Sequence, residues 1–532
     1  MAKVLKAGAL WLAIMVLVWL ITIWRWQSSG HDASTADIIW QLLVLPLALT
    51  GFFLAVLWGV VRLREQATAP IVAASAPSAS IGEAMSAKAA SRPVADPLSD
   101  EAQRRLSACV LAEAVTLAAG ADALSAWSSL QTQRVRPQLD RAFQDVDGMP
   151  VFTSRVADLD MRDWLDAHAE LAQGAGQASI LPEHVLRGLA LLEAPLHQML
   201  LAIGDLGLLP DDEHAALAHA HKEARSPVAD MGMKAHLSGV GAPVNVAQAQ
   251  ARAAVAPQLT VRLLLPSHWS GEDHAVAVDW VRSQCGGLLD WAEARRAKGL
   301  LWLTEPIERP EDLWQEIDRQ MVQWSRDARP ELLLILAVDT AVNEHGVERM
   351  QSVGELFTSS HQTGKVPGEA AAGLLLANAH WQGLAEAQAA SWVRMWRPVL
   401  ATRDKSADAA GRVGATTLGV ALQQAASLNQ ADKDAVLVVS DADHRASRTA
   451  ELFEAFQDAM PGVDPMLAVT RVGEACGEMG LARTLVPSVL ACAALRAGEA
   501  ADQVALAAHV QSSHERVVVA LAPWRAGEPV VA

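Results

Sequence analysis

A repeated alternation of short apolar runs with helix-like segments restricts the fold of this chain more than any other feature. Four strand-like runs lie at 259–266, 300–305, 331–339 and 370–378, and a second series lies at 435–441, 466–472, 504–510 and 516–523. Helix-like segments separate them, at 276–284 and 310–324 in the first series and at 416–428, 447–460 and from about Gly477 in the second. Because continuous apolar strands indicate a sheet buried on both faces, the two similar series predict a duplicated, five-layered α/β architecture.

The repeat divides most of the chain into two halves, which we place at residues 256–400 and 401–532. The preceding segment, residues 100–255, is mainly helical in pattern, with helix-like sequence at 107–127 and 178–207 and one strand-like stretch at 149–156. We interpret it as a helix-rich segment that packs on the larger body and can belong to its first half.

Two uncharged apolar runs, at 7–24 and 38–61, predict a transmembrane helix hairpin over residues 1–64, since about 20 apolar residues cross a bilayer. A cleaved signal peptide is the alternative for the first run, but no small-residue cleavage site follows it and a second span comes soon after. Basic residues flank the hairpin on its outer sides: Lys3, Lys6, Arg62 and Arg64. The positive-inside rule therefore places both termini and the large body in the cytoplasm. Residues 65–99, rich in Ala, Ser and Pro, are expected to be a flexible linker.

Charge and cysteine content restrict the partners and the compartment. The chain of 532 residues carries a net charge of −17, which disfavours binding to nucleic acid. Its cysteines are widely spaced, without a CxxC or CxxH pair: Cys109, Cys285, Cys476 and Cys492. Free thiols in a reducing cytoplasm are the simplest interpretation.

Two stretches of small residues stand out, one closing the first half and the other opening the last long helix of the second half. KVPGEAAAGLLLAN (365–378) joins a Pro-Gly turn to an apolar strand, and VTRVGEACGEMGLARTLV (469–486) precedes the last long helix. Small residues let backbone segments approach closely. Over about residues 255–525 these stretches resemble the thiolase-like β-ketoacyl-ACP synthases, in which a PGEGAA-like turn enters the last strand of the first half and a GHxxGAAG-like loop enters the buried helix of the second.

The resemblance implies a cysteine nucleophile at a helix N-terminus and two histidines that stabilise the reacting charges. Here the nucleophile position falls near Arg309 and Pro310, the first histidine position falls at Ser440, and the second falls at Glu474. All three positions are substituted, which predicts a catalytically inactive protein.

A relocated site is the alternative, with Cys476 near a helix start, His444 four residues after Ser440, and Glu474 as the group that orients the histidine. A buried cysteine that only packs is the commoner outcome for Cys476, and His444 lies in a charged segment typical of a solvated loop.

No cofactor or metal site is expected. The glycine pairs at 174–176 and 239–241 lack the preceding strand and the third glycine of a dinucleotide-binding loop. Three clustered histidines, His214, His219 and His221, lack the i,i+4 spacing of a helical zinc pair.

The resemblance extends to degenerate ketoacyl-synthase-like accessory proteins of bacterial type VI secretion systems. It implies a membrane-anchored scaffold that forms a homodimer and binds protein partners, secretion-machine components among them. The competing expectation is a membrane-tethered acyl-condensing or acyl-transfer enzyme acting on a carrier-protein thioester, which the net acidic body disfavours for an acidic carrier.

Overall fold

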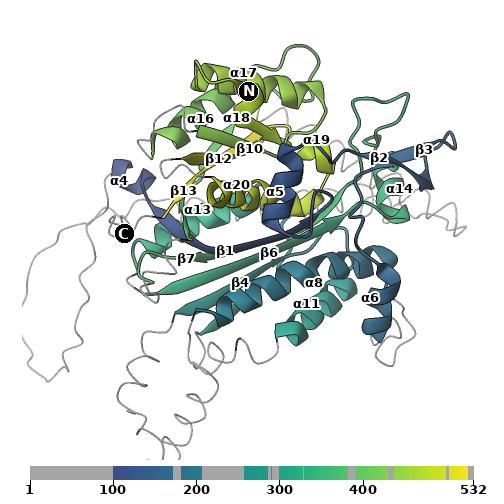
Figure 1. Cartoon of the computed structure of the whole chain (residues 1–532), viewed down its shortest axis with the longest axis horizontal. Helices are drawn as coiled ribbons and strands as arrows, with labels where there is room; N and C mark the ends of the chain where they lie inside the picture. The colour runs from purple at the N-terminus through teal and green to yellow at the C-terminus, as the bar shows by residue number, and fades with distance from the viewer. Residues whose placement is uncertain are drawn as a thin grey trace, which may run out of the picture. The chain divides into compact units, whose positions relative to one another are not determined.

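The computed structural model describes residues 100–169, 171, 181–206, 257–285, 289, 299–327, 329–381, 391–428, 436–498 and 503–524. They belong to one compact unit, Val94–Ala532, drawn in Figure 1. The expected hairpin at 1–64, the linker at 65–99, the glycine pairs at 174–176 and 239–241, and the histidines at 214, 219 and 221 lie outside the described residues.

Eleven strands form one mixed sheet in the order β11-β10-β12-β13-β8-β1-β7-β6-β4-β5, with β9 paired to β13. The first set comprises β1 (Ser107–Leu117), β4 (Gln258–Leu264), β5 (Leu300–Leu303), β6 (Glu331–Thr340) and β7 (Glu369–Ala377). The second set comprises β8 (Val393–Trp396), β9 (Val399–Thr402), β10 (Val436–Ser440), β11 (Val469–Arg471), β12 (Val504–His509) and β13 (Glu515–Pro523).

The strand order shows the duplication. If β8 and β9 are counted as one interrupted strand, each set runs third, second, fourth, fifth, first across the sheet. In both sets the fifth strand, β7 or β13, is antiparallel to its neighbours. The sets join where β1 pairs antiparallel with β8, from Ser107 opposite Trp396 to Val110 opposite Val393. The strand order therefore repeats across the sheet, with the first set beginning at β1 and the second at β8, whereas the sequence places the two halves at 256–400 and 401–532.

The three largest apolar clusters among the described residues lie between five layers of helices and strands (Figure 1). Residues from both ends of the sheet share the central cluster with α5 (Ala123–Gln131), α13 (Asp312–Trp324) and α20 (Val486–Ala497). The outer face of the first set packs on α8 (Glu183–Gly204) and α11 (Gly271–Cys285). The outer face of the second set packs on α16 (Thr416–Ser427) and α17 (Ala446–Ala459). Successive residues of a strand alternate between clusters, so Ala370 faces the centre and Ala371 faces α8.

Shorter elements connect these layers. A separate hairpin pairs β2 (Gln138–Gln144) with β3 (Pro150–Thr153). The remaining helices are short: α4 (Asp100–Arg104), α6 (Met161–Ala167), α14 (Glu344–Ser352), α18 (Pro465–Ala468), α19 (Val472–Cys476) and the 3-10 helix η4 (Gly480–Thr484).

The structure corrects the helix expected over 107–127. Residues 107–117 are strand β1, buried along most of its length and paired with β7 and β8, and only the second part of the stretch is helical, as α5. A short apolar run has no period that separates a buried strand from a buried helix, so pairing with distant strands decides the outcome. The strand expected over 466–472 is also shorter, because β11 is flanked by α18 and α19.

Within the described ranges one helix, α8, is long and apolar enough to cross a membrane by length and composition. It packs in the apolar cluster beneath β1, β4, β6 and β7, and 67% of its most apolar window is buried. Its placement is that of a core helix, and it carries the buried side chain of Arg187.

Candidate functional site

The two small-residue stretches lie directly against each other. The amide of Glu478 donates to the carbonyl of Val366 at 2.8 Å, and the amide of Gly368 donates back to the carbonyl of Glu478 at 3.1 Å. Ser154, after β3, joins both stretches: its amide donates to Pro367 at 2.8 Å and its hydroxyl donates to the carbonyl of Ala475 at 3.1 Å. The two stretches occupy different positions, one entering the fifth strand of the first set and the other following the third strand of the second, and they form a contact between the two sets.

Two glycines make this close approach possible. A Cβ at Gly368 would lie 2.2 Å from the carbonyl oxygen of Cys476, and a Cβ at Gly477 would lie 2.7 Å from the carbonyl oxygen of Val366. Neither distance leaves room for a side-chain carbon, so the contact requires glycine at both positions.

Glu369, the carboxylate of the first stretch, is a buried anchor. Its side chain is wholly buried and accepts two hydrogen bonds from Arg187 of α8, each 2.6 Å long. The amide of Val156 at 2.8 Å and the hydroxyl of Thr340 at 3.0 Å complete its partners. A buried carboxylate with four donors joins α8, β6, β7 and the segment after β3.

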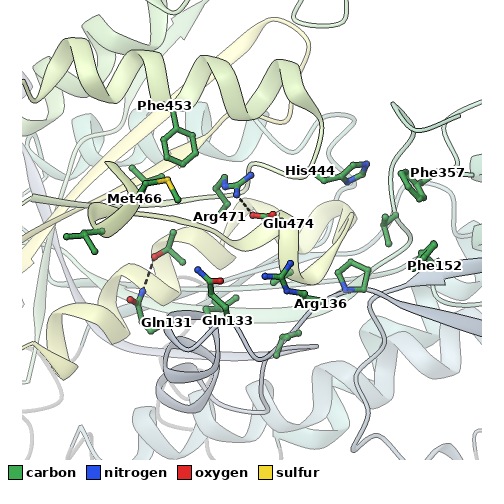
Figure 2. Close-up of a pocket in the computed structure, with 18 residues that line it drawn as sticks. Gln131, Gln133, Arg136, Phe152, Phe357, His444, Phe453, Met466, Arg471 and Glu474 are labelled. Atoms are coloured by element: carbon green, nitrogen blue, oxygen red, sulfur yellow. Dashed lines mark hydrogen bonds and ion pairs between the residues drawn. The ribbon is translucent and has the colours of Figure 1, made fainter. Parts of the chain in front are cut away.

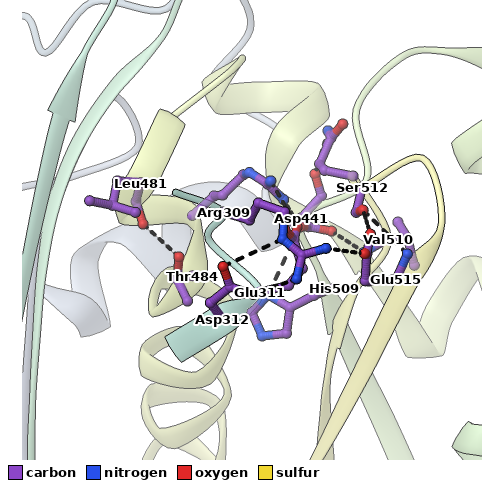
Figure 3. Close-up of polar contacts among 12 residues, drawn as sticks. Arg309, Glu311, Asp312, Asp441, Leu481, Thr484, His509, Val510, Ser512 and Glu515 are labelled. Atoms are coloured by element: carbon purple, nitrogen blue, oxygen red, sulfur yellow. Dashed lines mark hydrogen bonds and ion pairs between the residues drawn. The ribbon is translucent and has the colours of Figure 1, made fainter. Parts of the chain in front are cut away.

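A second buried charge cluster lies where several strand ends meet the start of α13. Arg483, in η4, lies 2.9 Å from Glu311 at the N-terminus of α13, 3.3 Å from Asp441 after β10, and 3.7 Å from Glu478. Figure 3 shows Glu311 and Asp441 beside His509, the last residue of β12. We refer to Glu311, Asp441, Glu478 and Arg483 as the Arg483 cluster. It joins the first half, through Glu311, to the second.

Burial and charge shift the pKa values in and around this cluster. Burial raises the pKa of Asp441 to about 6, although Arg483 and the amide of Val510 oppose the shift. Burial opposes ionisation of Glu478 as well, but Lys365, Arg483 and Arg445 outweigh it and keep the pKa of Glu478 below its ordinary value. Burial and the charge of Arg483 lower the pKa of His509 to about 3, so its imidazole is neutral near pH 7.

A polar cavity of about 840 Å³ opens beside the Arg483 cluster. Each cation that lines it has an anionic partner: Arg309 pairs with Glu515, Lys365 with Glu355, Arg445 with Asp443, Arg448 with Asp408, and Arg483 with Glu311. The cavity therefore presents neutralised cations, which bind an incoming anion more weakly than unpaired ones.

The positions implied by the resemblance lie around this cluster. Pro310 lines the polar cavity, next to Glu311. Ser440 is wholly buried at the end of β10, next to Asp441, and its hydroxyl accepts from the amide of Ala442 at 3.2 Å. Glu474 lies on α19, is partly exposed, and pairs with Arg471.

The relocated pair is not brought together. Cys476 is wholly buried in the central cluster, where burial raises the pKa of its thiol to about 12 against an opposing hydrogen bond from the backbone of Ala119. His444 instead faces the ring of Phe357, with 5.0 Å between ring centroids, and lines a second cavity together with Glu474.

All four cysteines of the chain are free and buried. Burial also raises the pKa of Cys109 and that of Cys492 far above the ordinary range. A thiolate is the nucleophilic form of cysteine, and these surroundings disfavour it.

The sequence analysis missed the charged residues of the Arg483 cluster. Glu311 and Asp441 each stand one residue from a position that it singled out, and Glu478 stands four residues from Glu474. A signal existed in Asp441, a lone carboxylate directly after a buried apolar strand. Sequence alone does not show that Arg483 reaches it.

No protein-family model matches the sequence, and no curated protein matches it. The solved structures that match the chain include ketosynthases and OleA. The ishigamide ketosynthase/chain length factor is 13% identical, with 79% of this chain and 100% of that chain covered and a TM-score of 0.42. The ketosynthase from module 6 of the bacillaene synthase of Bacillus subtilis 168 is 12% identical, with 79% and 72% covered and a TM-score of 0.46. OleA from Xanthomonas campestris, bound with cerulenin, is 14% identical, with 50% and 73% covered and a TM-score of 0.34. At these identities no residue role is transferred to this chain.

Proposed function

We propose that this protein is a catalytically inactive, thiolase-like scaffold. The observation that carries the proposal is the burial of all four thiols. The sequence resemblance implies a cysteine at the start of α13, and Pro310 and Glu311 stand there instead, with Glu311 held by Arg483. A condensing enzyme of this kind needs an accessible thiolate.

The polar cavity supports the same proposal. The cations around it are engaged by neighbouring carboxylates. Charges that neutralise one another stabilise the junction between the halves, whereas a catalytic site needs groups left available for the reacting atoms.

Cerulenin tests the proposal, since the competing enzyme acting on a carrier-protein thioester would carry a reactive thiol. The purified full-length chain is incubated with cerulenin or with iodoacetamide and then analysed by intact-mass spectrometry. We expect no adduct on the folded chain and four alkylated cysteines after unfolding in guanidinium chloride. A stoichiometric cerulenin adduct at Cys476 or another thiol of the folded protein would establish a reactive site and refute the proposal.

The scaffold is proposed to be anchored in the bacterial inner membrane by the hairpin at residues 1–64, with the body in the cytoplasm. The two uncharged runs and their basic flanks support this topology. In intact cells, a membrane-impermeant maleimide should label a Ser29→Cys variant and leave a Ser78→Cys variant unlabelled. The buried native thiols keep the background low. Labelling of Ser78→Cys alone would reverse the topology.

We further propose that the scaffold serves a type VI secretion system, on the support of the sequence resemblance. Anchoring raises the local concentration of a partner at the membrane, an effect that can reach about 10²–10⁴-fold without a new contact. Deleting residues 1–64 should therefore abolish contact-dependent killing at matched expression, whereas Cys476→Ala should preserve it. Full killing by the chain that lacks residues 1–64, together with loss of killing in Cys476→Ala, would contradict both the anchoring role and the catalytic inactivity.

A homodimer is part of the proposal and rests on the same resemblance. Strand β6 offers no free edge to a second copy, because it pairs with β4 on one side and with β7 on the other. Light scattering of the purified full-length chain at micromolar concentration should give the mass of two chains. A strictly monomeric mass would refute the dimer.

A further inference from the structure

A second cavity, of about 590 Å³, has no residue of the Arg483 cluster in its lining. It is bounded by the loop after α5, by strand β3, and by the segment that runs through α18, β11 and α19. It shares no lining residue with the polar cavity. Its volume is within the range of sites that take small organic ligands.

Aromatic or other apolar side chains lie at both ends of this cavity (Figure 2). At one end Phe357 meets Phe152 edge to face, with 5.8 Å between centroids, and also meets His444. At the other end lie Phe453 and Met466. Met466 is 71% exposed, so this apolar surface faces solvent rather than the core. Aromatic groups attract other aromatic rings edge to face and in offset stacks.

The charges that line the cavity leave one cation in excess. Arg471 pairs with Glu474 and lies over the ring of Phe453, 5.5 Å from its centroid. Arg136 extends into the space between the two aromatic ends (Figure 2), and it forms no ion pair with any residue that the structure describes. Among the residues that the structure describes, a chain with a net charge of −17 thus presents an unpaired guanidinium at a cavity lined by both apolar and polar side chains.

Two further features occur among the residues that line this cavity. The Nε2 atom of His444 is buried and has no hydrogen-bond partner in the described part of the chain. Gln133, which also lines the cavity, has a φ of 50° and is the single non-glycine residue with positive φ among the described residues. An unsatisfied buried polar atom costs free energy, and backbone strain of this kind concentrates at binding sites.

We propose that this cavity binds an amphipathic anion with an aromatic body, its carboxylate or comparable group held by Arg136 and its ring placed among the phenylalanines. An apolar cavity alone would accept neutral hydrophobic molecules, and an exposed arginine alone would bind anions weakly. Their combination selects molecules that carry both groups. The inference is independent of the scaffold proposal, because no residue of the Arg483 cluster and no cysteine lines this cavity.

Isothermal titration calorimetry of the purified full-length chain with 4-phenylbutyrate tests the assignment. We expect saturable binding of one molecule per chain, with at least about tenfold weaker binding of the neutral analogue 4-phenyl-1-butanol, since a hydrogen bond to a charged group is lost. Octanoate, which keeps the carboxylate and lacks the ring, should also bind more weakly. No saturable binding of 4-phenylbutyrate, or tighter binding of octanoate, would overturn the proposal.

Variants locate the site. Arg136→Gln should weaken 4-phenylbutyrate binding about tenfold or more, and Arg136→Lys should restore most of the affinity because it keeps the charge. Arg134→Gln is the matched control, since Arg134 lies on the same loop and does not line the cavity. Phe453→Ala should weaken binding of both the acid and the alcohol. Equal affinity in wild type, Arg136→Gln and Arg134→Gln would refute the site.

Discussion

At the scale of single residues, Glu369 shows how one buried carboxylate organises a motif. The sequence presents it as the lone charge between a turn and an apolar strand, and its wholly buried position and four donors explain its presence there. Sequence identified the stretch but gave no indication of Arg187, which lies 182 positions away in the chain.

Replacing Glu369 with Ala should lower the free energy of unfolding by about 3–5 kcal/mol, because Arg187 would remain as an uncompensated buried charge. Urea denaturation followed by tryptophan fluorescence measures the change. Glu355→Ala, which removes an exposed partner of Lys365, is the control and should cost less than about 1 kcal/mol. A similar small loss in both variants would contradict the role assigned to the buried pair.

We predict that His509 makes the free energy of unfolding of the protein decrease at acidic pH. Its pKa in the fold is about 3, below the ordinary value near 6.5, so the unfolded chain takes up the proton first as pH falls. Stability should therefore decrease from about pH 6.5 towards pH 3. Asp441 and Arg483 face the same ring. The raised pKa of Asp441, about 6, makes stability change with pH in the opposite direction. The contribution of His509 must therefore be measured as a difference between two proteins.

The comparison is between wild type and His509→Gln, which keeps the other groups. Between pH 7 and pH 5, wild type should lose about 2 kcal/mol more stability than the variant. Chemical denaturation at a series of pH values provides the measurement. Parallel pH profiles for the two proteins would show that His509 is not held neutral by the fold.

At the scale of elements, the sequence predicted secondary structure correctly where apolar residues recur with a clear helical or strand period. Helix α13 was expected over 310–324 and spans Asp312–Trp324, because its apolar residues recur at helical spacing. Strand β1 was missed because a buried strand has no polar face, and β11 is short because α18 and α19 interrupt its run. The pairing of the two glycine-containing stretches depends on contacts between elements, which no local pattern contains.

Gly368→Ala tests the contact between those stretches. The added Cβ would lie 2.2 Å from the carbonyl oxygen of Cys476, so the loops must separate, at a cost of about 1–3 kcal/mol. Gly414→Ala is the control, since a Cβ there meets nothing within 4 Å. Thermal melting monitored by circular dichroism should show a lower midpoint for the first variant alone, and equal midpoints would contradict the close approach.

At the scale of the whole molecule, the Arg483 cluster holds the halves together through charge. Replacing Arg483 with Met would leave Glu311, Asp441 and Glu478 without their shared cation, and we expect a loss of about 3–5 kcal/mol in the free energy of unfolding. Arg412→Met is the control, because its side chain is 80% exposed in its pair with Glu454. A loss no greater than that of the control would show that the cluster does not stabilise the junction.

The pairing of β1 with β7 and β8 also determines when the sheet can be completed during synthesis of the chain. Leu117 pairs with Ala370 and Ser107 with Trp396, so β1 leaves the ribosome long before either of its partners exists. At typical rates of about 5–20 residues per second, the delay is on the order of tens of seconds. Throughout that interval an eleven-residue, largely apolar strand has two unpaired edges, and exposed edges of this kind make a nascent chain prone to aggregation until the partner strands are synthesised.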